Sequence, residues 1–346
     1  MNLFNDFQVS VYVASVCSFL ITAILCFLLI KYISNFAKSK NTQKRLNDFN
    51  ILPLGGVAMA ISFFISVRLL GEADPEIVNI SIFALAISLL GVLDDFFNLN
   101  WKLKLFFQLI FVSLPIYILD QKINLEVFLG IDFGGLVNFV FTIFWVITLM
   151  NSINFIDNMD GLAVVVSSAI CIQIAVLTNY LNQYKLTDIS ILLLCAIGGF
   201  LFFNFPPAKL YFGDSGSLFI GFCLGFMSIL YNWLPENITV YSSTLSPILL
   251  IFSVPLIDFL VVVTYRISIG KSPTIGGTDH ISHRLLAKGF SEKKVLTIFL
   301  SYSFGTFGLI YLSIFTPTQI SYVLIGALFI LYFLAYFISI KLKVLT

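Results

Sequence analysis

The sequence predicts an all-α polytopic membrane protein with about 11 transmembrane helices, and three observations support that prediction. The first is composition: of 346 residues, 59% are hydrophobic and only 11% are charged, and the mean hydropathy is +1.01. Ordinary soluble domains carry about 25% charged residues, so this chain has too few charges to build a water-exposed surface. The other two observations are a succession of long apolar runs and an uneven distribution of Lys and Arg.

Eleven apolar runs approach the roughly 20 residues that a helix needs to cross a bilayer. They lie at 9–31, 51–70, 77–93, 103–119, 135–150, 161–180, 188–203, 215–232, 247–267, 295–315 and 318–340. No interruption between them is long enough for a soluble domain. We therefore expect one integral membrane domain that occupies residues 1–346 and is embedded in the lipid bilayer.

The basic residues predict the orientation, because short cytoplasmic loops retain Lys and Arg. If segment 32–50 is inside and the runs alternate, 16 of the 19 basic residues lie in or beside inner segments. Only Arg68, Lys122 and Lys185 lie elsewhere. The N-terminus is then outside and the C-terminus inside. The net charge of +1 gives no indication of nucleic-acid binding.

With this topology, most acids outside the outer loops fall in four inner segments, and both histidines of the chain lie in the last of them. These residues are Asp94 and Asp95, Asp157 and Asp160, Asp214, Asp279, His280 and His283. A single carboxylate at a membrane surface costs little free energy and is weak evidence for a functional site. Four sets on one face indicate a shared functional site.

The first two sets differ in how specific they are. Asp94 and Asp95 are adjacent like charges, which favour a cation near them. The same two acids could also be only the polar end of a helix. Asn151, Asn154, Asp157 and Asp160 recur at every third residue. On a helical turn such residues form one polar stripe, and a solvated helix end does not require that spacing.

The segment 203–217 is the richest in chemistry. Pro206 and Pro207 end the preceding helix. The small residues of Gly213–Ser217 let backbone N–H groups approach an anion at the start of the next helix, and Lys209 adds a point charge for a phosphate. Asp214 has two open interpretations, as the N-cap of that helix or as a metal ligand.

The last polar segment, Gly270–Arg284, is too polar to enter lipid and too rich in glycine to be helical throughout. It places His280 and His283 within four residues of each other, alongside Asp279 and Arg284. Both histidines of the chain lie in this one inner loop, which favours a functional role for them.

Five segments together resemble the polyprenyl-phosphate N-acetylhexosamine-1-phosphate transferases, the WecA-like and MraY-like membrane enzymes of glycosyltransferase family four. In chain order they are Pro53–Gly56, Gly91–Asp95, Asn151–Ala163, Asn204–Ser217 and Asp279–Arg284. The order covers most of the chain and all five lie on the predicted inner face. Asp-Asn-Met-Asp in the third segment is more similar to the WecA-like branch.

The resemblance implies a reaction: a sugar-1-phosphate, most readily GlcNAc-1-phosphate, passes from a UDP-sugar to undecaprenyl phosphate, and UMP is released. This reaction would begin a cell-surface polysaccharide such as lipopolysaccharide, at the cytoplasmic face of the bacterial inner membrane. Mg²⁺, with Mn²⁺ as the alternative, is the implied cofactor, since hard oxygen ligands and substrate phosphates hold it. A homodimer is compatible with the resemblance.

The resemblance also implies roles. Asp214 would ligate the metal, and Asp94 or Asp95 would orient or deprotonate the attacking lipid phosphate. His280 and His283 would belong to the catalytic loop, with Lys209 and Arg284 contacting substrate. Asn154, Asp157, Asp160 and Tyr211 would hold the uridine end, where Tyr211 offers a stacking face.

Two positions depart from the family pattern. Ser282 stands where the histidine loop commonly has another histidine, and Thr278 stands where a basic residue often precedes the Asp-His pair. We expect Ser282 to tune sugar or phosphate recognition. Because the loop is polar and on the water side, we also expect Ser282→His to be tolerated sterically.

Two other functions remain open at this point. One is transfer of phospho-MurNAc-pentapeptide in peptidoglycan synthesis. The other is a secondary transporter, whose carboxylates would bind a coupling ion near the bilayer midplane; Asp258, inside the ninth apolar run, is the acid that fits this class.

The orientation predicts the location of three reporter fusions. Reporters placed after Asn50 and after Gly289 should report cytoplasm, and one near Asn237 should report periplasm, because 16 of 19 basic residues lie on the inner side. A periplasmic signal at Gly289 would separate the histidine loop from the other acidic segments and contradict a shared inner face.

Overall fold

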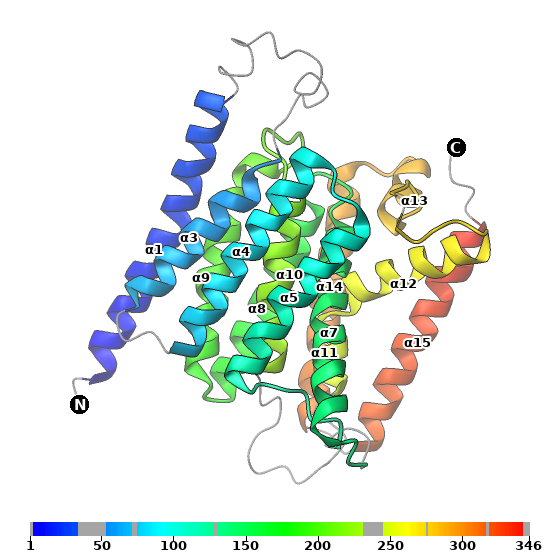
Figure 1. The fold of residues 1–346 in the computed structure, drawn as a ribbon. Coiled ribbons are helices and arrows are strands. Elements are labelled where there is room, and N and C mark those ends of the chain that lie inside the picture. The colour runs from blue at the N-terminus through cyan, green and yellow to red at the C-terminus, as the bar shows by residue number, and fades with distance from the viewer. Residues whose placement is uncertain are drawn as a thin grey trace.

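The computed structural model describes residues 3–33, 53–70, 75–126, 131–230, 245–274, 276–315 and 318–341, and in these ranges the chain is helical and contains no strand. Most helices run side by side along one axis (Figure 1). The basic segment 34–50 and the outer-loop acids Glu72, Asp74 and Glu236 lie outside the described residues.

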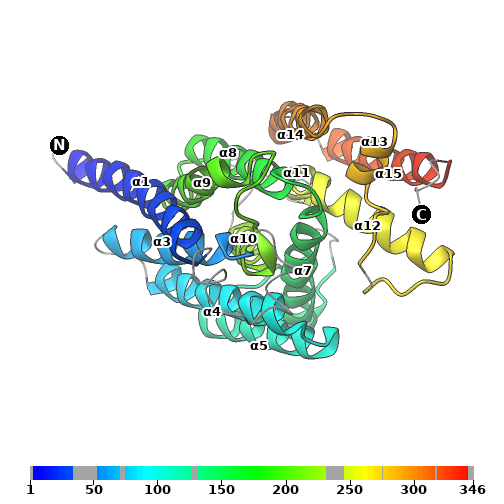
Figure 2. The same cartoon turned by 90° about the horizontal axis from the view of Figure 1, so that it is seen from above.

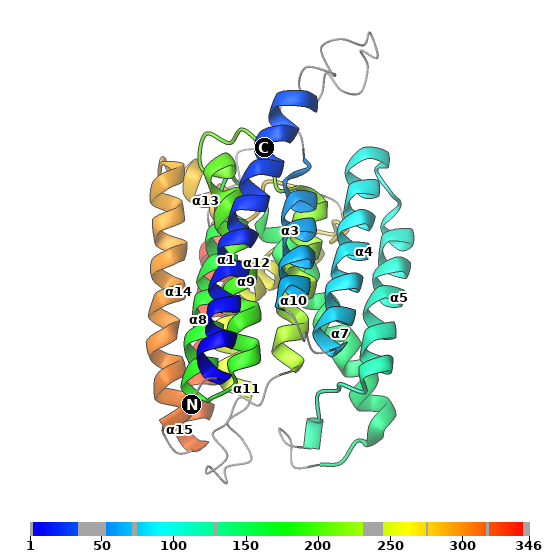
Figure 3. The same cartoon turned by 90° about the vertical axis from the view of Figure 1, so that its left-hand side faces the viewer.

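The helices follow one another up and down the bundle. They are α1 (Leu3–Leu28), continued by a π-helical turn η1 (Leu29–Ile33), α3 (Gly55–Leu69), α4 (Pro75–Phe97), α5 (Trp101–Leu119), α7 (Gly134–Ile156), α8 (Leu162–Tyr180), α9 (Tyr184–Asn204), α10 (Gly213–Ile229), α11 (Leu245–Ile251), α12 (Ser253–Ser268), α13 (Ile281–Ala287), α14 (Glu292–Phe315) and α15 (Thr318–Lys341). Helix α1 begins at one end of the bundle and α15 finishes at the other (Figures 1 and 3).

The chain is a polytopic membrane protein. Within the described ranges, seven helices are long and apolar enough to cross a membrane: α1, α4, α5, α7, α8, α9 and α14. The shorter apolar helices are Gly55–Leu69, Gly213–Ile229 and Gly326–Phe337. Several helices exceed the predicted runs, so that Asp94 and Asp95 lie in the last turns of α4 and Asp214 lies in the first turn of α10.

Helix α10 is the centre of the bundle. Every residue from Ser215 to Ile229 is buried, and the view along the bundle shows α10 enclosed by the other helices (Figure 2). A helix that is apolar on all sides belongs in a protein interior. Its closest neighbours are α4 and α7, so its N-terminus lies where those two helices end.

Two glycines permit α10 to approach its neighbours this closely. A Cβ atom on Gly56 of α3 would lie 2.0 Å from the backbone nitrogen of Gly216, and one on Gly91 of α4 would lie 2.4 Å from Cα of Ser215. Both contacts are with backbone, which cannot move aside. The glycines of the first two sequence segments therefore set the distance between α10 and the helices around it.

The ninth predicted run is not one continuous helix. Helix α11 ends at Ile251 and α12 starts at Ser253, with Phe252 between them. Pro255 has no N–H to donate into the preceding turn, which accounts for the break. Helix α12 is strongly inclined to the upright helices (Figure 1), and it carries Asp258 and Arg266 toward the segment 270–284.

Gly91→Ala should destabilise the protein by about 1–3 kcal/mol, the usual cost of overpacking a filled interior. The physical reason is the clash with α10 backbone described above. The measurement is the midpoint of thermal denaturation in detergent. Gly305→Ala is the matched control: Gly305 lies in α14 with no atom near the added Cβ, and alanine favours a helix. Equal midpoints for the two variants would contradict the packing argument.

Candidate active site

The five sequence segments are joined by hydrogen bonds at one end of the bundle. The N–H groups of Gly55 and Gly56 donate to the carbonyls of Tyr211 and Phe212, at 3.1 and 3.2 Å. The second and third segments also bond to the 204–217 segment, and the third bonds to the histidine segment, as described below. The segment from Asn204 to Ser217 is therefore the hub of the site.

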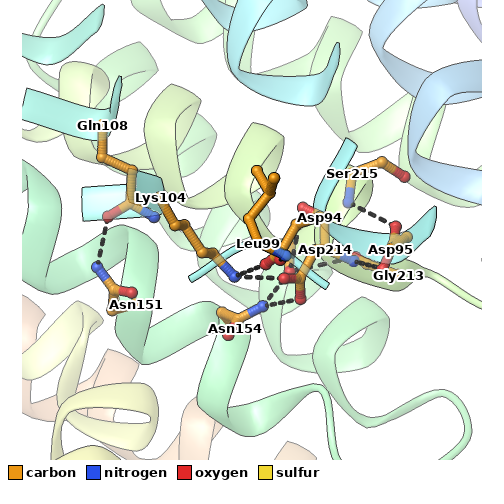
Figure 4. A network of polar contacts seen from close by, with 11 residues as sticks. Asp94, Asp95, Leu99, Lys104, Gln108, Asn151, Asn154, Gly213, Asp214 and Ser215 are labelled. Atoms are coloured by element: carbon orange, nitrogen blue, oxygen red, sulfur yellow. Dashed lines mark hydrogen bonds and ion pairs between the residues drawn. The ribbon is translucent and has the colours of Figure 1, made fainter. Parts of the chain in front are cut away.

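A lysine joins the two carboxylates that the sequence assigned to different segments. Lys104, in the first turn of α5, has its Nζ 2.7 Å from Oδ2 of Asp94 and also contacts Oδ2 of Asp214. The Asn154 amide donates to Oδ1 of Asp214 at 2.6 Å and to Oγ of Ser217 at 2.8 Å. Figure 4 shows four side chains converging from α4, α5, α7 and α10: Asp94, Lys104, Asn154 and Asp214.

Asp95 caps the central helix. Its Oδ1 accepts from the N–H of Asp214 at 3.0 Å and its Oδ2 from the N–H of Ser215 at 3.3 Å (Figure 4). The predicted N-cap role of Asp214 is thus wrong, because Asp214 lies inside the helix and α10 has no side-chain cap of its own at Phe212. The prediction that backbone N–H groups at the start of α10 bind a phosphate is also wrong for Asp214 and Ser215, because their N–H groups already donate to Asp95.

The predicted polar stripe is interrupted. Helix α7 ends at Ile156, since Asn158 Nδ2 donates to the Phe155 carbonyl and the N–H of Asp157 donates to that of Asn154. Asn151 and Asn154 are on the helix, where Asn151 donates to Gln108 at 3.2 Å. Asp157 and Asp160 instead lie in the following turn.

The turn after α7 lines a cavity of about 320 Å³. Its walls include Asp157, Asp160, Tyr211 and Gly213. Asp160 accepts from the N–H of Ala208 at 2.9 Å and so fixes the segment that forms the opposite wall. Burial, followed by the charges of Asp214, Asp95 and Asp160, raises the pKa of Asp157 well above its usual value.

Tyr211 and Lys209 both lie at the surface of this hub. The Tyr211 side chain is 40% exposed, so its ring is available as a stacking face. Lys209 is exposed and is held through its backbone, whose N–H donates to the Phe203 carbonyl at 2.7 Å. Its ammonium can therefore meet a phosphate from the water side.

The buried acid of α12 holds the first histidine. Asp258 is 1% exposed; its Oδ2 lies 2.8 Å from Nδ1 of His280, and its Oδ1 accepts from the N–H of Ile281 at 2.9 Å. Because a carboxylate accepts, Nδ1 carries the hydrogen and Nε2 is the imidazole nitrogen that remains for another partner. Asp258 thus orients His280.

His283 lies next to His280, with the ring centroids 5.9 Å apart. Burial, and then the charge of His280, lowers the pKa of His283. The shift favours the neutral form of the His283 imidazole.

A second ion pair fixes the start of the histidine segment. Arg266 binds Asp279 through two hydrogen bonds of 2.7 Å and also donates to the Pro273 carbonyl at 2.9 Å. Burial opposes ionisation of Asp279, but the Arg266 contacts outweigh it and the pKa of Asp279 is lowered. Arg284, expected to bind substrate, is 3% exposed; its Nε donates to the Asp279 carbonyl and its guanidinium lies over the Tyr265 ring.

Ser282 is not the exposed residue that the loop composition indicated. It is fully buried in α13 and its hydroxyl donates to Oδ1 of Asn158. The premise of that expectation, a water-exposed side chain at position 282, is therefore wrong, and the steric tolerance of Ser282→His stays a prediction. The hydroxyl joins the histidine segment to the turn that lines the cavity.

Four residues of this site were missed as site residues in the sequence: Lys104, Asn158, Asp258 and Arg266. Lys104 and Arg266 were counted only as basic residues on the inner side. Asp258 carried the clearest signal, since a lone acid inside an apolar run needs a partner. For Lys104 the signal was weaker, a cation in the first turn of an apolar helix.

Residues 77–232 match the family model described as glycosyl transferase family 4. A protein of Bacillus subtilis (strain 168), described as a probable undecaprenyl-phosphate N-acetylglucosaminyl 1-phosphate transferase, is 31% identical over 274 residues, covering 76% of this chain and 74% of that protein. A phospho-N-acetylmuramoyl-pentapeptide-transferase of Wolbachia sp. subsp. Brugia malayi (strain TRS) is 28% identical over 317 residues, 82% of this chain and 93% of the relative.

A decaprenyl-phosphate N-acetylglucosaminephosphotransferase of Mycobacterium leprae (strain TN) is 33% identical over 201 residues, which cover 53% of this chain and 50% of the relative. The resemblance read from the five segments is thereby confirmed. The Bacillus protein is 31% identical over 74% of its length, and the family model matches residues 77–232 of this chain. The chain therefore belongs to glycosyl transferase family 4.

Proposed function

We propose that this protein transfers GlcNAc-1-phosphate from UDP-GlcNAc to undecaprenyl phosphate at the cytoplasmic face of a bacterial inner membrane. The family and the named activity of the Bacillus relative support it. The observation that carries it is the junction of an acidic, lysine-bridged cluster with a polar cavity of about 320 Å³ at one end of a membrane bundle. We further propose eleven membrane crossings, with α11 and α12 together forming the ninth.

In the proposed reaction, an oxygen of the lipid phosphate attacks the phosphorus that bears the sugar. The bond between that phosphorus and the bridging oxygen breaks, and UMP leaves with the electron pair. The products are polyprenyl-diphospho-GlcNAc and UMP. Phosphoryl transfer requires mainly positioning and electrostatic stabilisation, and both are what charged groups on fixed helix ends provide.

The residues present fit Mg²⁺. In this structure a cationic ammonium, that of Lys104, already lies between Asp94 and Asp214, so the pair is built to hold positive charge. Among the described residues no group of three or more His, Cys, Asp or Glu gathers at metal-ligand spacing. Mg²⁺ commonly takes one or two carboxylates and completes its shell with substrate phosphates and water. Bound there, it would neutralise the charge that develops on the diphosphate.

The remaining residues divide into positioning and binding groups. Asp214 would hold the metal, and Asn154 would fix the orientation of the Asp214 carboxylate. Asp94 would orient or deprotonate the attacking lipid phosphate. We propose Asp95 as a positioning residue, since both of its oxygens are engaged by α10. The cavity at Asp157, Asp160 and Tyr211 would take the uridine end, and Lys209 would meet a phosphate at its edge.

The Wolbachia relative supports a second candidate, transfer of phospho-MurNAc-pentapeptide, because its match spans 93% of its length. The transporter alternative has lost its main support. Asp258, the acid inside the ninth run, is already paired with His280.

Release of UMP from a panel of UDP-sugars, with purified protein and undecaprenyl phosphate, tests the function. We expect turnover with UDP-GlcNAc; turnover only with UDP-MurNAc-pentapeptide would replace the proposal by the second candidate.

Asp214→Asn should lower the rate of UMP release by at least about three orders of magnitude, roughly 4 kcal/mol. Asp120→Asn, an exposed change at the other end of α5, should leave that rate unchanged. Normal turnover of well-folded Asp214→Asn protein would contradict its role as metal ligand.

A double-mutant cycle tests whether Asp258 acts through His280. Asp258→Asn should lower kcat/KM by about 10- to 100-fold, as loss of a partner that orients a histidine does. In a His280→Ala background the same change should have little further effect, because the imidazole it orients is gone. Equal losses in both backgrounds would show instead that Asp258 serves only the packing of α12 and α13.

A further inference from the structure

The position of Lys104 has a consequence for the metal. Its ammonium is largely withdrawn from solvent, with the side chain 16% exposed, and it lies between Asp94, 13% exposed, and Asp214, 26% exposed. An ion pair this enclosed is screened less than a surface pair. Without the ammonium, two carboxylates from α4 and α10 would face each other, with Asp95 beside Asp214 (Figure 4).

The two oxygens of Asp214 have different partners. Oδ1 accepts from the neutral amide of Asn154 at 2.6 Å, and Oδ2 contacts the ammonium of Lys104. A carboxylate oxygen has room for a metal and a neutral donor together, since it offers more than one lone pair. Two cations on the same carboxylate repel each other strongly at such distances.

We propose that Lys104 is a built-in counter-ion of the metal-free site, and that a divalent cation displaces it from Asp214. This inference rests on the proposed metal role of Asp214. Asn154 can stay in place during the exchange, whereas Lys104 and the metal exclude each other at Asp214. Because the metal can bind only where Lys104 has left Asp214, the apparent metal affinity falls in proportion to the fraction of molecules in which Lys104 is away from Asp214. Before substrate and metal arrive, the ammonium keeps the carboxylates of α4 and α10 together.

The test is the affinity of the purified protein for Mn²⁺ alone, with free Mn²⁺ measured by electron paramagnetic resonance. Lys104→Gln removes the competing cation, so its dissociation constant for Mn²⁺ should be at least about fivefold lower than that of the unmodified protein. In EDTA the same variant should denature at a lower temperature, and Mn²⁺ should raise its midpoint more than it raises that of the unmodified protein.

Two matched variants separate this exchange from a general change of charge. Lys102→Gln removes the same charge two residues earlier on α5, where the side chain is exposed and lies beside Trp101; its Mn²⁺ affinity should be unchanged. Lys104→Arg keeps a cation between the carboxylates, so its affinity should equal or fall below that of the unmodified protein.

The inference is overturned if Lys104→Gln binds Mn²⁺ no more tightly than the unmodified protein, or if Lys102→Gln tightens binding equally. Tighter binding by Lys104→Arg would also overturn it. Failure of the proposed function gives a different result: Asp214→Asn would then bind Mn²⁺ as the unmodified protein does, or UMP release would proceed at full rate in EDTA.

Discussion

The first turn of α10 imposes the constraint on which the site depends. A helix leaves its first backbone N–H groups without partners inside the helix, and α10 is buried along its length, so these donors need an acceptor from elsewhere in the protein. Asp95 provides it with both oxygens. The negative charge also suits the positive end of the helix dipole. This contact ties α4 to α10, and Gly91, one turn earlier, allows the backbones to come close enough to form it.

Once α10 is fixed, the carboxylates of the site fall into two groups. Asp95, Asp160, Asp258 and Asp279 each accept hydrogen bonds from backbone, histidine or arginine groups of another segment, so their charges hold the site together. Asp94 and Asp214 share a single lysine, and Asp157 lines the cavity with a raised pKa. The acids that remain to act on a ligand are therefore the cavity acid Asp157 and the pair whose charge is balanced by the Lys104 ammonium.

The parts of this arrangement that the sequence predicted follow from local chemistry. Apolar runs located the helices, and the basic residues and acidic segments identified one functional end, because both depend on neighbours along the chain. The pairing of Lys104 with Asp214, 110 residues away, and of Ser282 with Asn158, 124 residues away, depends on packing. Ser282 was misjudged because a polar loop was taken as exposed. The stripe was overextended because Asn158 ends α7 by competing for a backbone carbonyl.

The site consists of two halves, and Phe155 lies at their junction. One half is built on α10 and holds Asp94, Asp214 and the cavity; the other is built on α12, whose Asp258 and Arg266 fix the histidine segment. Phe155, in the last turn of α7, contacts the rings of Phe259 and His280 at 5.0 and 5.7 Å, and the Arg266 guanidinium lies over it at 5.5 Å. Each half is held internally by ion pairs, whereas these ring contacts and the Ser282–Asn158 hydrogen bond join them. Ring contacts tolerate sliding better than bidentate ion pairs do, so a change in the tilt of α12 would move His280 relative to Asp214 while leaving both halves intact.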